Sequence, residues 1–167
     1  MTQVDFHHPL TRQIADFLRR IGLEVRAGTV PERTALPGIT IDRGVLIVEE
    51  ARLTYPGDLL HEAGHLAVVA PARRATFHHD VGKDGGDEMA AIAWSYAAAL
   101  HLKIDPALVF HEAGYRGGSG AILTNFAGGH YFGVPILSLA GLAHEPRRAA
   151  ADDVESYPHM IRWLREA

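Results

Sequence analysis

The chain has 167 residues, of which 47% are hydrophobic and 22% are charged, and its formal net charge is −4. These values are those of a globular chain with one core, and we expect a single domain over residues 1–167. The small negative charge argues against a nucleic-acid partner or an anionic membrane surface. Because there is no cysteine, thiolate metal sites, disulfides and cysteine nucleophiles are excluded.

No targeting or membrane segment is expected. The first residues lack the basic start and the apolar stretch of a signal peptide. The apolar runs Leu66–Ala70 and Val134–Ala143 are too short to span a bilayer, and proline or glycine ends or interrupts them. A cytoplasmic protein without a membrane partner is the expectation.

The first half of the chain predicts a helix followed by short strands. Apolar residues fall on one stripe of a helix over Pro9–Ile21. Leu23–Ala27 alternates as a half-buried strand does, and Ile39–Val48 contains two β-rich runs around an Asp42-Arg43-Gly44 turn. A small antiparallel sheet is therefore expected before the middle of the chain.

The middle of the chain predicts two helices joined by a polar connection. Asp58 can cap a helix from Leu59 to about Ala70, where Pro71 ends it. Arg73–Gly86 is polar and glycine-rich, as a surface connection is. Asp87–Leu102 is rich in alanine with apolar residues at helical spacing, which predicts a long buried helix.

The last third predicts short helices around an irregular loop. Asp105-Pro106 opens a short helix to about Ala113. Gly114–Gly133 holds seven glycines and is expected to be a long loop. Pro135–Ala143 is expected to form a buried helix, and Pro158 to begin a final one. The fold class expected from these elements is α+β, mostly helical, with the small sheet ahead of the Leu59–Ala70 helix.

One short motif carries specific chemistry. His61-Glu62-Ala63-Gly64-His65 matches H-E-x-x-H. Residues at i and i+4 share a helix face, so both imidazoles can reach one ion, and imidazole suits zinc at roughly 2.0–2.1 Å. Glu62 lies on the same turn, where it can deprotonate a water activated by the metal. The motif predicts one Zn²⁺ held by His61 and His65, with Glu62 as the general base.

The motif also has a structural interpretation, in which the two histidines are satisfied core residues and the glutamate is a cap. The surrounding helix is apolar, with Leu59, Leu60 and Leu66 beside the motif. Burying two imidazoles and a carboxylate in such a helix is costly unless they are paired or bound to a metal. The metal interpretation is therefore the favoured one.

A catalytic zinc normally takes three protein ligands, so one more is needed. The best candidate is Glu88, at the start of the alanine-rich helix, which can pack closely across the motif helix. Asp87 is the neighbouring alternative but is more natural as a helix cap. His78, His79 and Asp80 form a second candidate cluster in the polar connection.

The motif with an acidic residue on a following helix resembles the gluzincin zinc metallopeptidases. The strand-rich Ile39–Glu49 and the sequence Glu88-Met-Ala-Ala are similar to the compact ImmA/IrrE-like members of that group. The likeness covers Val45 to Leu102, and the glycine-rich segment has no counterpart in it. The resemblance implies a compact zincin-like fold, zinc held by His61, His65 and Glu88, and hydrolysis of a peptide bond with Glu62 as base.

Hydrolysis also requires a donor for the developing oxyanion. Four candidates lie in or beside the glycine-rich segment: His111, Tyr115, His130 and Tyr131. His111-Glu112-Ala-Gly repeats the first letters of the motif, and we treat it as a coincidence or as a residue supporting the site from outside the ligand set.

The leading hypothesis is a zinc-dependent metallopeptidase acting on a peptide or protein substrate. A second hypothesis is a catalytically inactive module that keeps the zincin scaffold for regulation or interaction. A third is a metal-free helical binding domain, which would contain no stoichiometric zinc. The substrate, the native metal and the oligomeric state are not determined by the sequence.

Overall fold

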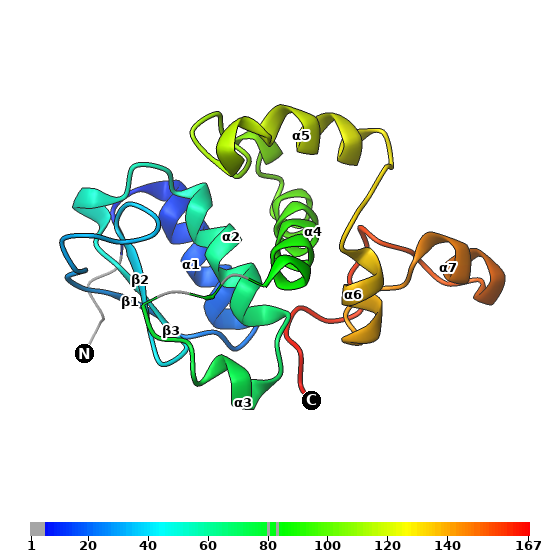
Figure 1. Cartoon of the computed structure of the whole chain (residues 1–167), viewed down its shortest axis with the longest axis horizontal. Helices are drawn as coiled ribbons and strands as arrows, with labels where there is room; N and C mark the ends of the chain where they lie inside the picture. Colours follow the sequence, from blue (N-terminus) through cyan, green and yellow to red (C-terminus); the bar gives the residue numbers. More distant parts are fainter. Residues whose placement is uncertain (1–5, 80, 83) are drawn as a thin grey trace.

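The computed structural model describes residues 6–79, 81–82 and 84–167. It has an α+β architecture, as expected, with the strands at one side and two central helices, α2 and α4, beside them (Figure 1). The elements in chain order are α1 (Pro9–Arg20), β1 (Val25–Ala27), β2 (Ile39–Asp42), β3 (Val45–Val48), α2 (Gly57–Ala67), α3 (Pro71–Arg74), α4 (Gly85–His101), α5 (Ser119–Ala127), α6 (Val134–Leu139) and α7 (Pro146–Asp152).

The sheet is mixed and has the strand order β1-β3-β2. β2 and β3 form the expected hairpin, with Ile39 opposite Val48. Arg43 and Gly44 both have positive φ, of 47° and 85°, which is typical of the two-residue turn that matches strand twist. β1 adds a parallel pair, with Val25 opposite Leu46, so the sheet is not wholly antiparallel.

The core lies where α1, α2 and α4 meet. Ile14 and Leu18 of α1 are fully buried, as the apolar stripe of Pro9–Ile21 predicts. Trp94 of α4 is also fully buried, and its ring centroid lies 6.2 Å from that of Phe17. The indole Nε1 of Trp94 donates to the carbonyl oxygen of Trp163 at 2.9 Å. The C-terminal segment is thereby tied to the core.

Two N-cap expectations were wrong. The α2 helix begins at Gly57, so Asp58 lies inside its first turn and its carboxylate makes no capping bond. At α4 the cap is Asp84, whose Oδ1 accepts from the backbone N–H of Asp87 at 2.9 Å. In both cases the helix begins at a glycine two residues before the expected position, which is within the usual variation of helix ends. Asp87 instead forms an ion pair with Arg73.

Two expectations about the last third of the chain were also wrong. Gly114–Gly133 contains α5, because the apolar side chains of Ile122 and Phe126 can be buried on one helix face. The chain from Pro158 is not helical: Met160 pairs in a β-bridge with Ala143. The polar connection Arg73–Gly86 is largely irregular, as expected, and α3 takes in only its first two residues. The helices expected over Asp105–Ala113 and Pro135–Ala143 are shorter than predicted, a 3₁₀ turn at Pro106–Leu108 and α6.

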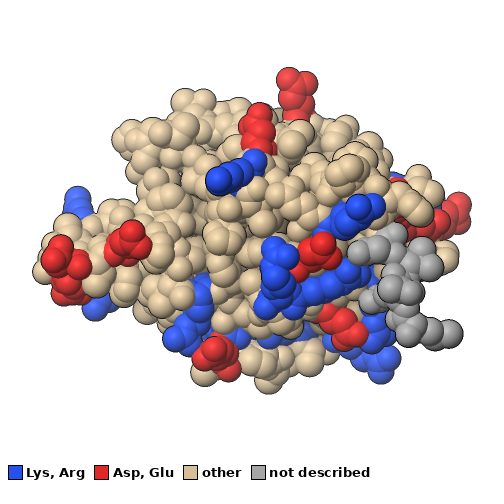
Figure 2. All heavy atoms as spheres, turned by 180° about the vertical axis from the view of Figure 1, so that it is seen from behind, with Lys and Arg blue, Asp and Glu red and all other residues tan. Residues whose placement is uncertain are grey.

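The surface charge is mixed. On the face opposite the view of Figure 1, basic and acidic side chains lie among each other with wide uncharged areas between them (Figure 2). Within the part of the chain that the structure describes, no helix has both the length and the apolar character needed to cross a membrane.

Candidate metal centre

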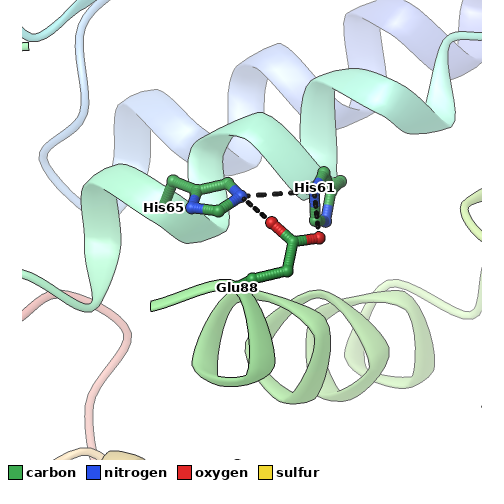
Figure 3. A group of neighbouring side chains, drawn as sticks. All are labelled: His61, His65 and Glu88. Carbon is green, nitrogen blue, oxygen red and sulfur yellow. Dashed lines mark hydrogen bonds and ion pairs between the residues drawn. The ribbon is translucent and has the colours of Figure 1, made fainter. Parts of the chain in front are cut away.

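The α2 helix carries both histidines of the motif on the side that faces α4. His65 is buried, with 5% of its side chain exposed, and His61 is nearly so, at 11%. Their Nε2 atoms lie 3.3 Å apart, as the spacing of one helical turn predicts. Figure 3 shows the two rings projecting from α2 toward the first turn of α4.

The third member of the group, Glu88, comes from α4. Its side chain is 44% exposed, and one carboxylate oxygen lies 2.9 Å from Nε2 of His65 while the other lies 3.4 Å from Nε2 of His61. The expectation that Glu88 joins the two histidines is confirmed in its placement. Because Asp84 caps α4, Glu88 falls in the first helical turn, where the helix dipole favours a carboxylate.

The spacing of the three donor groups suits one tetrahedral cation. Two bonds of about 2.0–2.1 Å that meet at the tetrahedral angle separate their ligand atoms by about 3.3 Å. The two Nε2 atoms lie 3.3 Å apart, and each has one oxygen of the Glu88 carboxylate near it, Oε1 at 3.4 Å from His61 and Oε2 at 2.9 Å from His65. All ligand atoms of His61, His65 and Glu88 lie within 4.8 Å of one another, so this group can hold a metal ion.

The electrostatics of the cluster favour a cation. Hydrogen bonding to His61 and His65 lowers the pKa of Glu88 well below its ordinary value. The carboxylate is therefore ionised at neutral pH. Two imidazoles and one carboxylate form a nitrogen and oxygen donor set that zinc accepts, as do other divalent transition metals.

Glu62 lies beside the cluster but outside the ligand set. It is 8% exposed, and burial raises its pKa, an effect that the neighbouring His65 and His61 oppose. Together with His61, His65 and Glu88 it lines a cavity of about 320 Å³. Its position therefore places a carboxylate of raised basicity next to the three candidate ligands.

A second cavity, of about 440 Å³, lies on the other side of His61 and Glu88. The two cavities share Ala35, Leu36, His61 and Glu88 as lining residues. The two cavities therefore adjoin at the cluster, with the loop before β2 in the wall of both, and we refer to them together as the cleft. The second cavity is also lined by His111 and Tyr115.

Tyr115 approaches the cluster from the segment before α5. Its ring centroid lies 5.2 Å from that of His61. Burial raises the pKa of its hydroxyl, and the carboxylates of Glu88, Asp58 and Glu62 raise it further. Among the described residues the buried hydroxyl has no hydrogen-bond partner. It is therefore a buried, protonated donor on a residue that lines the second cavity.

The other residues considered from the sequence lie elsewhere or outside the description. His130 and Tyr131 line a separate cavity, with Glu145 and Arg147. Nδ1 of His78 lies 3.3 Å from Oδ1 of Asp42, and its ring centroid lies 3.9 Å from that of His79. Neither histidine joins a metal-ligating group within the described residues. Asp80 lies outside the described residues.

The sequence did not assign Asp58 its observed role. Asp58 is 5% exposed and its Oδ1 accepts a hydrogen bond of 2.6 Å from Nε2 of His111. The ring of His111 stacks on Tyr55 with centroids 3.8 Å apart. The available signal was the D-x-x-H spacing of Asp58 and His61, which puts both residues on adjoining turns of one helix.

Comparison with protein-family models, with curated proteins and with solved structures gives no match for this chain.

Proposed function

We propose that this chain is a zinc-dependent peptidase of the gluzincin type, with His61, His65 and Glu88 as metal ligands and Glu62 as general base. The observation that carries the proposal is the convergence of these three donors, at spacings that suit one cation, beside a buried glutamate. The motif supplies two ligands and the base, and the packing of α4 on α2 supplies the third.

Zinc in such a site supplies Lewis-acid activation of a water nucleophile and of the scissile carbonyl group. Glu62 takes the proton from the attacking water and then donates it to the departing amine, so that one carboxylate serves as base and acid in turn. The cost of burying Glu62 raises its basicity, which suits this task.

The hydroxyl of Tyr115 is the donor for the oxygen that becomes negatively charged as the carbonyl is attacked. It is buried without a partner among the described residues, it remains protonated, and its ring lies beside His61 in the wall of the cleft. A hydrogen bond that strengthens as charge develops lowers the barrier more than one made equally to the ground state.

The test uses the whole chain with zinc and a peptide library of mixed sequence, read by mass spectrometry. Glu62→Gln should keep one zinc per chain and lose hydrolysis by about 10²- to 10⁴-fold, the range that general-base catalysis contributes. His61→Ala should lose both zinc and hydrolysis.

Equal turnover by Glu62→Gln and the wild type would refute the mechanism. A wild type that binds zinc but cleaves no peptide in the library would favour the inactive zincin-like module instead. A wild type without stoichiometric zinc would refute the metal site itself.

A further inference from the structure

A buried Asp–His pair lies directly behind the candidate metal cluster. Asp58 and His111 are joined by the 2.6 Å bond described above, and their side chains are 7% and 14% exposed. Asp58 is in the first turn of α2, and His111 follows the 3₁₀ turn at Pro106–Leu108. This pair is not part of the ligand set, and the peptidase mechanism above does not use it.

The position of Asp58 relative to His61 is fixed by helix geometry. The two residues are three positions apart on α2, so they are neighbours on adjoining turns. Side chains of a helix lean toward its N-terminus, which directs the ring of His61 over the turn that holds Asp58. Burial raises the pKa of Asp58, while His111 and His61 oppose that rise. Both imidazoles therefore act on the same carboxylate.

Each of these two side chains has one buried polar atom without a hydrogen bond. Within the described part of the chain, neither Oδ2 of Asp58 nor Nδ1 of His61 has a partner. One atom is an acceptor and the other can be a donor. The two atoms do not bond each other in the structure, although both are buried and their residues stand on adjoining turns of α2. Leaving both unpaired is costly, which favours a rotation of the two side chains that joins them.

We propose that Asp58 is a positioning residue for the metal ligand His61: when a metal is bound at Nε2 of His61, Oδ2 of Asp58 accepts a hydrogen bond from Nδ1 of that ring while His111 holds Oδ1. The inference rests on the proposed metal site but not on peptide hydrolysis. A carboxylate on the far nitrogen of a ligating histidine places the proton there and leaves Nε2 free to bind the metal. It also fixes the ring orientation and makes the imidazole a stronger ligand.

His111 completes the arrangement because it limits how Asp58 can rotate. Its own ring is held by the stacking contact with Tyr55. The carboxylate is thereby held at Oδ1, while Oδ2 has no partner among the described residues. The chain of contacts links the loop before α5 to the metal ligand through a single buried carboxylate.

The test measures zinc affinity by competition with a chromophoric chelator, and the visible spectrum of the Co²⁺-substituted chain. Asp58→Asn keeps the shape of the side chain but removes its charge, and its zinc affinity should fall by about 10- to 100-fold, as it does when such supporting groups are removed elsewhere. His111→Phe keeps the stack on Tyr55 and leaves the carboxylate, so the loss should be smaller, about 10-fold or less. Both variants should shift the Co²⁺ spectrum.

Asp87→Asn is the matched control, because it removes a carboxylate beside Glu88 that pairs with Arg73 and not with a histidine. Its zinc affinity should stay within about 3-fold of the wild type. The melting temperature of each metal-free variant separates lost folding from lost affinity; if Asp58→Asn does not fold, His111→Phe decides alone.

Unchanged affinity and an unchanged Co²⁺ spectrum in the folded variants would overturn the role of Asp58. A wild type that binds no zinc would instead refute the proposed metal site, so the two failures are distinguishable. A weaker affinity for His111→Phe than for Asp58→Asn would also overturn the proposal, since the carboxylate would then not be the group that acts on His61.

Discussion

A Cβ atom on Gly64 would lie 2.9 Å from the carbonyl oxygen of Ala91 and 3.2 Å from its Cα. Gly64 precedes His65 on α2, and Ala91 is one turn beyond Glu88 on α4. The two helices that carry the candidate ligands therefore meet backbone to backbone at this point. The separation of His65 from Glu88 depends on a glycine within the motif itself.

Gly64→Ala should destabilise the chain and weaken zinc binding. The added methyl group must push α2 away from α4, and overpacking of a core usually costs about 1–3 kcal/mol of unfolding free energy. Thermal unfolding and zinc titration measure the two effects. Gly120→Ala is the control, since a Cβ there meets nothing within 4 Å among the described atoms. That change should raise stability by up to about 1 kcal/mol, and an equal loss in both variants would contradict the packing argument.

Glu88→Gln should weaken zinc binding while Asp87→Asn should not. Glu88 brings a charged oxygen to both histidines, and an amide is a poorer ligand for a divalent ion. Isothermal titration with zinc compares the two variants at one pH. If Asp87→Asn lost the metal and Glu88→Gln kept it, the neighbouring acid would be the true third ligand.

Zinc should stabilise the folded chain. A ligand that binds only the native state adds about 2.7 kcal/mol to the free energy of unfolding when its free concentration is 100 times Kd. The melting temperature should therefore rise with zinc and fall on addition of a chelator. His65→Ala should abolish this dependence, whereas His130→Ala, which lines a different cavity, should preserve it.

Glu62→Gln should raise the stability of the metal-free chain at neutral pH. Burial raises the pKa of Glu62 above its ordinary value of 4.5, so the folded state holds this proton more tightly than the unfolded state. Between the ordinary and the raised pKa, unfolding releases a proton, and the free energy of unfolding falls as the pH rises. Above the raised pKa, the folded chain bears the whole cost of burying an ionised carboxylate.

Melting curves of the metal-free wild type and Glu62→Gln between pH 4 and pH 8 measure this effect. The advantage of the variant should be larger at pH 8 than at lower pH and should shrink as the pH falls toward 4.5. Glu112→Gln changes an exposed carboxyl and should show no such advantage. A Glu62→Gln variant less stable than the wild type at pH 8 would mean that the ionised carboxylate is stabilised by the fold.

Tyr115→Phe should reduce peptide hydrolysis and leave zinc affinity unchanged. Removing one donor to a developing oxyanion typically costs about 10²- to 10³-fold in kcat, and the phenyl ring preserves the packing against His61. Steady-state kinetics on a peptide identified from the library separate kcat from KM. Tyr131→Phe, outside the cleft, is the control and should keep the wild-type kcat. If Tyr115→Phe raised KM and left kcat unchanged, Tyr115 would bind substrate and would not stabilise the oxyanion.

The features that the sequence by itself determined are those set by neighbours along the chain. The spacing of His61 and His65 places their nitrogens on one helix face whatever surrounds them. The apolar stripe of α1 and the turn at Arg43-Gly44 were predicted for the same reason. The position of Glu88 near the two histidines was also predicted, because it lies in the first turn of an alanine-rich helix that can pack closely on the motif helix.

Contacts between distant segments decided the rest. The bond from His111 to Asp58 and the approach of Tyr115 to His61 join residues about fifty positions apart, and periodicity carries no information about such pairs. The helix α5 was missed for the same reason. The glycines at its borders predicted a loop, whereas in the folded chain the burial of Ile122 and Phe126 stabilises a helix. Local propensities differ by less than about 1 kcal/mol per residue, so burial of a few side chains outweighs them.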